Sequence, residues 1–365
     1  MLEKIELGWT WCNCGNLSAR QNVPKFDRLA RERRDLSHMN SLLSPRAIAR
    51  SIYESPVVAG FRRAHYEQYV ERESRRTQSI VQALGFNLLT TDALDVLGGR
   101  EKKTLFILGS GASVNRLTEA HFDVVRQNYS IGMNAWVSHS FVPDAYSFES
   151  DSISAPPSVE IKAMSEALSQ RALAKPDTVL LLLRPKKPEL VHRMVEVPES
   201  LRDRAFMYGR HNLLTRTNSA LRQDLGPFLA NRLKNFERRP VLIDNGASVV
   251  RMIDVGLYAG FREIVLLGID LNSSPYFWEA TDTAPSHREM RGLYQRPPNS
   301  EHDTLETFDR PYSNLLFIEE LARGAERVFG ASVYVGSEGS SLSGKIPDYD
   351  WNVVQTASKK FTSAP

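Results

Sequence analysis

The chain has 365 residues and a formal net charge of +3, and 42% of its residues are hydrophobic against 24% charged. This is the composition of a soluble globular protein with enough apolar residues for one large domain or two ordinary ones. Two cysteines, Cys12 and Cys14, exclude a disulfide framework, and their spacing does not suit a metal site. No apolar run approaches the roughly 20 residues of a membrane span, and no signal-peptide core is present, so we expect a cytoplasmic protein.

Residues 1–100 are basic, with 15 lysines and arginines against 11 acidic residues. Apolar spacing predicts helices over 43–53 and 58–85, and Gly98 and Gly99 mark the end of this N-terminal helical extension. Acidic residues interleave the arginines, which favours a solvated helical face. The alternative is peripheral contact of these helices with the anionic inner membrane surface or with an acidic partner. We expect no nucleic-acid binding, because no recognisable module accompanies the arginines.

From Lys103 the pattern changes to alternating strands and helices. The predicted strands are 104–108, 129–133, 144–148, 178–183, 241–243, 263–267 and 332–335. The predicted helices are 117–127, 158–173, 217–236, 247–259 and 312–329. Strands separated by helices predict a Rossmann-like α/β fold, a mostly parallel sheet with helices on both faces. We expect this domain over 101–347, with a lid at about 272–311 and a C-terminal tail at 348–365.

A tight small-residue turn follows the first strand, in T-L-F-I-L-G-S-G-A-S-V over residues 104–114. Glycine lets the backbone approach a phosphate closely, and the N-terminus of a following helix offers unpaired N–H donors. A helical segment from about Leu117 completes the order strand, turn, helix. The turn therefore indicates a nucleotide or phosphorylated ligand, although it is neither a dinucleotide fingerprint nor a P-loop. The alternative is a turn that is simply tight.

Further polar residues follow other strands. Residues 245–248, N-G-A-S, form a second corner between a strand and a helix, and Asp270 follows a buried strand. There the carboxylate either binds a ribose or amino group or caps the next turn. Asn134 ends a strand, where it offers an amide to a base or phosphate or serves as a turn residue. Glu149 and Asp151 form an acidic pair that superficially resembles the D-x-D metal motif of many glycosyltransferases.

In this order, the segments resemble the bacterial sialyltransferases of glycosyltransferase family 42 and a wider group that includes 6-hydroxymethylpterin diphosphokinase-like proteins. The resemblance covers about residues 103–345 and rests on I-L-G-S-G-A-S-V, G-M-N, N-G-A-S and, most specifically, G-F-R-E-I-V-L-L-G-I-D followed by N-S-S-P-Y-F-W. Residues 332–347 resemble the family's closing strand and small-residue turn, whereas residues 1–100 have no counterpart. The resemblance implies a GT-A-like variant of the fold and a CMP-linked donor. It also implies transfer of sialic acid or a related 2-keto sugar to a glycan or glycolipid acceptor, as in lipopolysaccharide or capsule biosynthesis.

By position, the resemblance implies a set of residues around the donor. Those implied at the nucleotide are Gly109, Ser110, Gly111, Ser113, Asn134, Asn245, Gly246, Ser248 and Asp270. Tyr276 matches a catalytic tyrosine that donates a hydrogen bond to the leaving phosphate. Two positions differ in kind from the family, because Ser110 replaces an asparagine and Asn272 replaces a second tyrosine.

A third difference concerns charge. Glu149 falls near a family asparagine, and a carboxylate close to a phosphate would repel it unless a cation or an arginine intervened. The family also has an arginine just before the second corner. Here only Arg238 and Arg239 lie nearby, a few residues upstream.

The family's base is a histidine in the lid. His287 and His302 lie there, and the resemblance implies His302, which stands at the corresponding distance before the helix at 312–329. The ordinary pKa of histidine suits proton transfer near neutral pH. The implied reaction is inverting, with CMP leaving as backbone N–H groups of the turn at 109–113 and Tyr276 stabilise its charge. A metal is not expected to be essential, because a nucleoside monophosphate carries less charge than a diphosphate.

Three alternatives stay open. One is a transferase that uses another nucleotide donor, with a divalent metal held by Glu149 and Asp151. Another is a pterin pyrophosphokinase that uses ATP and Mg²⁺. The third is a non-catalytic nucleotide-binding scaffold whose helical extension docks a partner. A homo-oligomer is compatible with each of them.

Overall fold

The computed structural model describes residues 51–52, 54–95, 103–149, 159–213, 215, 217–235, 241–272, 274–280 and 313–352. The chain divides into two compact units, Met1–Tyr53 and Glu54–Pro365, and every element below belongs to the second. The first part of the predicted extension, most of the predicted lid and the end of the predicted tail lie outside the described residues.

Nine strands form one sheet in the described part of the chain, and all of their pairings are parallel. They are β1 Asn87–Leu88, β2 Thr104–Leu108, β3 Tyr129–Met133, β4 Ala145–Phe148, β5 Val179–Leu183, β6 Ala205–Asn212, β7 Val241–Asp244, β8 Glu263–Leu267 and β9 Ser332–Val335. Their order is β1-β6-β5-β4-β3-β2-β8-β9, and β7 pairs with the second half of β6. The parallel α/β class predicted from the sequence is confirmed.

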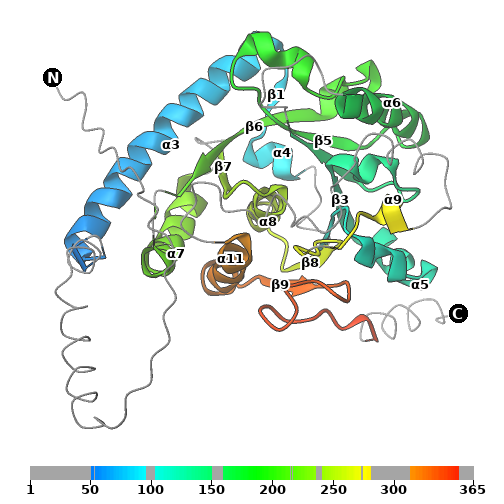
Figure 1. Ribbon diagram of the computed structural model, residues 1–365. Helices are drawn as coiled ribbons and strands as arrows, with labels where there is room; N and C mark the ends of the chain where they lie inside the picture. Colours follow the sequence, from blue (N-terminus) through cyan, green and yellow to red (C-terminus); the bar gives the residue numbers. More distant parts are fainter. Residues whose placement is uncertain are drawn as a thin grey trace, which may run out of the picture. The chain divides into compact units, whose positions relative to one another are not determined.

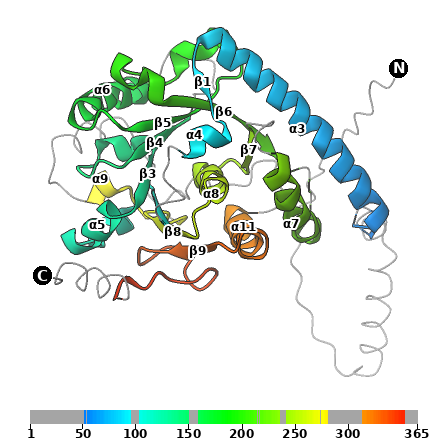
Figure 2. The ribbon, with the colours of Figure 1, turned by 180° about the vertical axis from the view of Figure 1, so that it is seen from behind.

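Helices cover both faces of this sheet (Figures 1 and 2). The α-helices are α3 Pro56–Leu84, α4 Thr91–Asp95, α5 Glu119–Arg126, α6 Val159–Ala174, α7 Asn218–Asn235, α8 Ser248–Tyr258, α9 Phe277–Ala280 and α11 Asn314–Phe329. The 3-10 helices are η1 Ala112–Arg116, η2 Asn134–Ser138, η3 Pro188–Arg193 and η4 Glu199–Arg204. In both views α7, α8 and α11 lie on one side of the sheet, and α5 and α6 lie on the other.

The strands are buried on both faces because apolar side chains alternate into two cores. On β2, Leu105 and Ile107 belong to one core, and Phe106 and Leu108 belong to the other. Burial of consecutive residues on both faces is what a parallel sheet between two helical layers requires. It explains why the strands read as unbroken apolar runs in the sequence.

The strand order reverses between β2 and β8. From β2 the chain runs outward through β3, β4 and β5 to β6, and it then returns to place β8 on the other side of β2. Ligands of open parallel sheets bind outside the carboxyl ends of the strands at such a switch point. The turn after β2 and the segment after β8 therefore occupy the place where the topology favours a ligand.

Two features differ from the sequence-based expectation. Residues 56–95, which the sequence assigns to an N-terminal extension, belong to the same compact unit as the sheet, since β1 pairs with β6 and α3 packs beside it. The pattern also does not indicate β1 or β6 as strands. The last three residues of β6, Arg210, His211 and Asn212, are polar and line a cavity described below.

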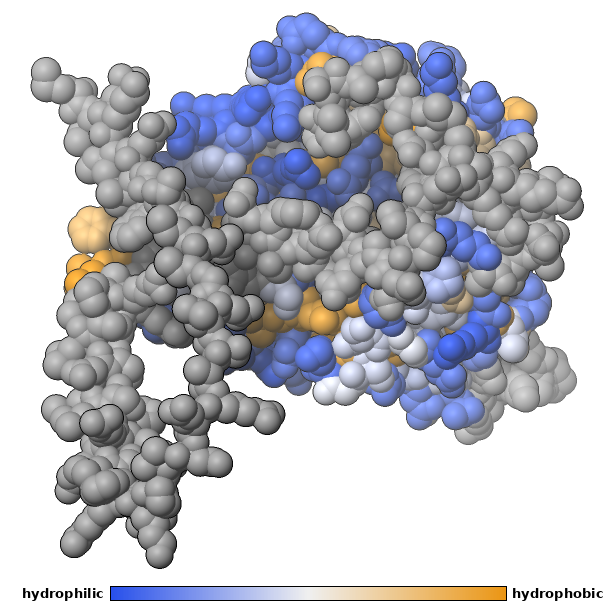
Figure 3. Space-filling model, in the orientation of Figure 1, coloured by the Kyte–Doolittle hydropathy of each residue, from blue (hydrophilic) through white to orange (hydrophobic). Residues whose placement is uncertain are grey.

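Helix α3 presents different surfaces along its length. Val57 and Phe61 are exposed in its first turns, where Figure 3 shows an apolar patch, and the later turns are hydrophilic. None of the described helices combines the length and the apolar character that crossing a membrane would require.

Candidate functional site

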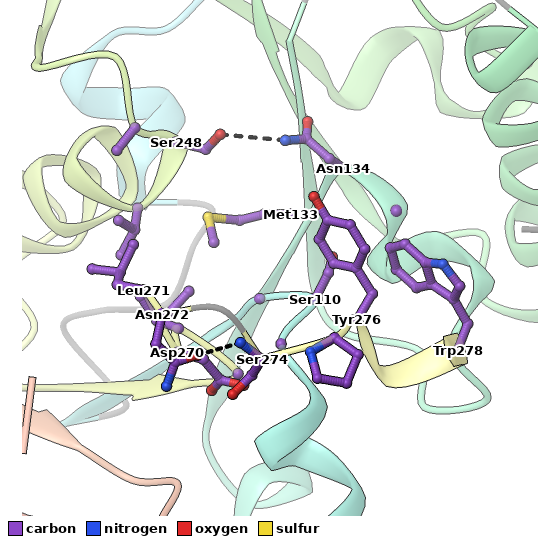
Figure 4. Close-up of a pocket in the computed structure, with 18 residues that line it drawn as sticks. Ser110, Met133, Asn134, Ser248, Asp270, Leu271, Asn272, Ser274, Tyr276 and Trp278 are labelled. Atoms are coloured by element: carbon purple, nitrogen blue, oxygen red, sulfur yellow. Dashed lines mark hydrogen bonds between the residues drawn. The ribbon is translucent and has the colours of Figure 1, made fainter. Parts of the chain in front are cut away.

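A pocket of about 200 Å³ opens at the switch point, beyond the ends of β2, β3 and β8 (Figure 4). The turn at 109–111 lines one side, and Ala247 and Ser248 line it from the start of α8. The two small-residue corners singled out in the sequence therefore face one cavity. Segment 268–272 after β8 completes the wall.

The structure brings together eight of the thirteen residues that the sequence predicts for the site. The pocket is lined by Gly109, Ser110, Gly111, Asn134, Ser248, Asp270, Asn272 and Tyr276. Ser113, Glu149, Asn245 and Gly246 do not line it, and His302 lies outside the described residues. Asn245 is buried instead and donates to Asn314 Oδ1 over 2.7 Å.

The glycines of the first corner allow β2 and the segment after β8 to approach each other. A Cβ atom on Gly111 would lie 2.4 Å from the Asp270 carboxylate, and one on Gly109 would lie 2.3 Å from the Ile269 side chain. Gly268 has a φ of +65°, and a Cβ atom on it would lie 2.4 Å from the Gly109 carbonyl oxygen. Packing therefore accounts for these glycines before any ligand is considered.

The backbone of this corner is not the open phosphate cradle that the sequence predicts. The N–H groups of Gly109, Gly111, Ala112 and Ser113 donate to Leu267 O, Gly268 O, Pro275 O and Asp270 Oδ2, respectively. The segment that follows is the short 3-10 helix η1, and α5 begins only at Glu119. These four donors are used within the protein, so anion binding there would need other groups.

Asp270 is part of the support for the pocket. Its carboxylate accepts from the hydroxyl and the N–H of Ser113, and the Ser113 hydroxyl lies 2.9 Å from Ser337 Oγ. Ser337 Oγ in turn accepts from the Gly268 N–H over 3.1 Å. Burial raises the pKa of Asp270 above its ordinary value, against the opposing effect of the Ser113 hydrogen bonds. The closing segment after β9 thus holds the ends of β2 and β8 together.

Asn134, Ser248 and Glu149 form a closed ring of hydrogen bonds. Asn134 Nδ2 donates to Ser248 Oγ over 3.3 Å, as Figure 4 shows, and Asn134 Oδ1 accepts from the Glu149 N–H over 3.2 Å. The Ser248 hydroxyl donates to the Glu149 carboxylate. Glu149 does not line the pocket itself, but it is hydrogen-bonded to two residues that do, Asn134 and Ser248.

Arg251 neutralises Glu149. The Arg251 side chain is fully buried in α8 and forms ion pairs with both Glu149 and Asp244. Burial would raise the pKa of Glu149, but the charge of Arg251 and the Ser248 hydrogen bond outweigh it and hold that pKa below its ordinary value. This is the intervening arginine that a carboxylate near a phosphate requires.

The sequence does contain a signal for Arg251. Residues 249–253 read V-V-R-M-I, so a single arginine interrupts an apolar helix run. A charge on a buried helix face needs a charged partner, which the paired carboxylates provide. Arg238 and Arg239, the arginines considered from the sequence, lie outside the described residues.

The pocket also concentrates unusual backbone conformations. Asn134 and Leu271 have φ values of 47° and 48°, and they are the non-glycine residues with positive φ in the described part of the chain. Both line the pocket. Asparagine tolerates this region, whereas leucine adopts it only under constraint. Such conformations cluster at functional sites, where the surrounding structure enforces them.

Tyr276 and Trp278 form an aromatic wall. Their rings stack with centroids 4.5 Å apart, and the Tyr276 hydroxyl points toward Asn134 in Figure 4. The Phe277 N–H donates to Ser110 O over 3.0 Å, which ties this segment to the first corner. A flat apolar surface with a hydroxyl at its edge suits a planar ring joined to a polar group.

The electrostatics of the described lining are simple. It contains one carboxylate, Asp270, and no lysine or arginine. Within the described ranges, no three histidine, cysteine, aspartate or glutamate side chains are placed to hold a metal ion. Asp151, which the sequence pairs with Glu149, lies outside those ranges.

No family model matches the chain, and no curated protein matches its sequence. Among solved structures, it is similar to the monofunctional α-2,3-sialyltransferase Cst-I from Campylobacter jejuni, at 15% identity and a TM-score of 0.37, over 69% of this chain and 82% of that one. It is also similar to the MAf glycosyltransferase from Magnetospirillum magneticum AMB-1, at 16% identity and a TM-score of 0.38. That match covers 76% of this chain and 42% of the other, so the chain spans less than half of that protein.

Proposed function

We propose that the chain is a glycosyltransferase that binds a nucleotide-linked sugar in the pocket at the switch point. The observation that carries this proposal is the meeting of two small-residue corners, 109–111 and 247–248, in one cavity beyond β2 and β8. The sequence resemblance at both corners supports the same conclusion. The stacked aromatic pair and the constrained Asn134 and Leu271 are further features of a ligand site.

The donor we propose is a CMP-linked sugar acid. A diphosphate brings more charge into a site than a monophosphate, and it calls for lysine, arginine or a metal. The described lining offers instead neutral hydroxyl and amide groups, those of Ser110, Asn134, Asn272 and Tyr276. This supports a singly charged phosphate diester as the group next to the sugar, whereas the choice of a sugar acid rests on the sequence resemblance alone.

In the proposed reaction, an acceptor hydroxyl attacks the anomeric carbon and displaces CMP with inversion. The new bond joins the acceptor oxygen to that carbon, and the bond from the carbon to the phosphate oxygen breaks with its electron pair going to CMP. Tyr276 donates a hydrogen bond to that departing oxygen, and a base takes the acceptor proton. The resemblance assigns the base to His302.

The acceptor in this proposal is a glycan or glycolipid, as in lipopolysaccharide or capsule biosynthesis. The enzyme would work in the cytoplasm or at the inner surface of the membrane. The basic residues of the N-terminal segments are the proposed means of contact with that surface.

Donor hydrolysis tests the proposal without knowledge of the acceptor, because water can take the place of the acceptor hydroxyl as the nucleophile. The protein is incubated with CMP-, UDP- and GDP-linked sugars and with ATP, each with EDTA or with Mg²⁺ and Mn²⁺. Release of CMP from a CMP-linked sugar acid in EDTA is the expected result. Turnover of another nucleotide sugar only with metal would favour the metal-dependent transferase. Turnover of ATP alone would favour a pyrophosphokinase, and no turnover together with nucleotide binding would favour a scaffold.

A further inference from the structure

A second cavity, of about 330 Å³, lies further along the carboxyl edge of the sheet. It is formed where β5, β6 and β7 end, and the later turns of α3 supply its outer wall. We call it the basic pocket and define it by the lining residues Glu73, Arg76, Arg184, Lys186, Arg210 and Asp244. It shares no lining residue with the pocket at the switch point.

The carboxylates of the basic pocket are already paired. Glu73 forms an ion pair with the buried Arg184, which also donates from Nε to Thr77 Oγ1 over 2.9 Å. Asp244 is 3% exposed and binds Arg251 from behind the pocket, with 2.6 Å between Oδ1 and Nη1. Both acids therefore balance arginines that are themselves buried.

The six residues that define the pocket include four cations and two carboxylates, so two positive charges are left in excess. Arg210 is 38% exposed and lies 3.4 Å from the already paired Asp244, and Arg76 is 49% exposed and lies 3.5 Å from the already paired Glu73. Lys186 is exposed, and the described residues give it no ion pair. A concave site with unbalanced lysine and arginine attracts an anion, since these side chains suit phosphate and carboxylate oxygens.

A chain of polar contacts joins this site to the first pocket. It runs from Ser248, which lines the first pocket, through Glu149, Arg251 and Asp244 to Arg210. The two linings also adjoin along the chain, because Gly246 lines the basic pocket and Ala247 lines the first pocket. A single extended ligand can therefore reach from one cavity into the other.

We propose that the basic pocket binds an anionic group, a phosphate or a carboxylate, on the acceptor. The inference rests on the proposed function, and it adds a substrate class, acceptors that carry negative charge several bonds from the reacting hydroxyl. Both cavities open along one edge of one sheet, so a single acceptor can lie across the ends of β4 to β7 while the donor occupies the switch point.

The test measures anion binding directly, by calorimetric titration of the full chain at constant ionic strength. The probes are glucose 1-phosphate, glucuronate and uncharged glucose, which separate a phosphate from a carboxylate and both from the sugar itself. Lys186→Gln and the Lys186→Gln/Arg210→Gln pair remove cations from the pocket. Arg75→Gln is the matched control, because Arg75 is the neighbour of Arg76 on α3, is 76% exposed and pairs with Glu71 outside the pocket.

The expected result is binding of one or both charged sugars and not of glucose, weakened about tenfold for each cation removed and unchanged by Arg75→Gln. Saturating CMP should leave this binding unaltered, because the two ligands occupy separate cavities. Binding that is absent, that is equal in all variants, or that CMP displaces would overturn the inference. Titration of CMP alone tests the first pocket separately. If CMP does not bind, the proposed function is contradicted, and so is the acceptor role of the basic pocket that depends on it. CMP binding without anion binding contradicts only the basic pocket.

Discussion

At the residue scale, the site depends on one buried cation. Arg251 forms ion pairs with both Glu149 and Asp244, and the Glu149 carboxylate lies one hydrogen bond away from the pocket at the switch point. A buried ion pair is costly to break, because the remaining partner keeps its desolvation penalty. Replacing Glu149 is accordingly a sensitive probe of the arrangement.

Glu149→Gln should lower the free energy of unfolding by about 1.5–3 kcal/mol at pH 7, since a hydrogen bond to a charged partner contributes at about this level. The pKa of Glu149 is depressed in the folded state, so its contribution is present above the ordinary glutamate pKa of about 4.3 and is lost as the pH falls through the depressed value. Urea unfolding at pH 7, 5 and 4 measures the effect. The gap between variant and parent should persist at pH 5 and begin to narrow at pH 4, which lies below the ordinary glutamate pKa.

The matched control is Glu199→Gln, because Glu199 is 90% exposed and its nearest arginine is 4.0 Å away. It should leave stability unchanged at each pH. Equal effects of the two substitutions would contradict the role assigned to the Glu149–Arg251 pair.

Tyr276→Phe tests the catalytic assignment. Removing a hydroxyl that stabilises developing negative charge should lower the rate of CMP release by about 10²-fold, with little change in the melting temperature. Tyr349→Phe removes a buried hydroxyl that has no hydrogen-bond partner and lies outside the pocket, and it should leave the rate unchanged. A Tyr276→Phe enzyme with the parental rate would exclude the tyrosine from the chemistry.

Sequence patterns identify the site residues whose backbone position fixes them. Ser110, Asn134 and Asp270 follow strand ends, and strand ends of a parallel sheet meet along one edge, so their convergence is predictable. Sequence patterns do not predict whether a side chain that follows a strand points into the pocket or into the protein core. Asn245 follows β7 just as Asn134 follows β3, yet it turns inward to Asn314, a partner 69 residues away that no local pattern reveals.

At the element scale, the corners between strands and helices are the rigid parts of the site. Each of the glycines 109, 111 and 268 is placed where a Cβ atom would overlap the neighbouring corner. The corner after β2 is therefore held by packing and by its own N–H bonds, which orient Ser110 toward the pocket.

Gly111→Ala should destabilise the protein by about 1–3 kcal/mol, because the new methyl group would meet the buried Asp270 carboxylate. Gly60→Ala is the comparison, since Gly60 lies inside α3 and a Cβ there meets nothing within 4 Å. It should stabilise the protein by about 0.5–1 kcal/mol through the loss of unfolded-state freedom. Thermal and urea unfolding measure both, and opposite signs are expected. Two changes of the same sign would show that the first corner has more room than the close approach implies.

Elements with a uniform environment are predictable, and those with a mixed one are not. Strands β2 and β5 are buried along their whole length, and β8 is buried after its first residue, so their apolar runs identify them. Strand β6 begins apolar and ends in G-R-H-N, of which Arg210, His211 and Asn212 line the basic pocket. The sequence pattern does not reveal β6 as a strand, because the polar residues that line the cavity interrupt the apolar run by which a buried strand is recognised.

At the scale of the whole molecule, two cavities share the carboxyl edge of one sheet, and α3 closes the second of them. Helix α3 buries Tyr66, Val70 and Ile80 against the rest of the unit. It is therefore a structural part of the domain, whereas the sequence alone assigns it to an appended segment.

Truncation tests that statement. A chain that begins at Glu54 should unfold cooperatively with a melting temperature close to that of the parent, because the unit Glu54–Pro365 is retained. A chain that begins at residue 96 loses α3 and β1, exposes the apolar surface that they cover and should be insoluble or lack a cooperative transition. Circular dichroism melting of the purified proteins is the measurement. Independent folding of the shorter chain would restore the boundary near residue 100.

We expect the pocket at the switch point between β2 and β8 to bind cytidine monophosphate without a metal. The decisive measurement is calorimetric titration of CMP in EDTA into the parent protein and into Ser110→Phe, whose ring would fill the cavity. We expect saturable one-to-one binding to the parent and none to the variant. Binding of equal strength to both proteins, or no binding to the parent, would contradict it.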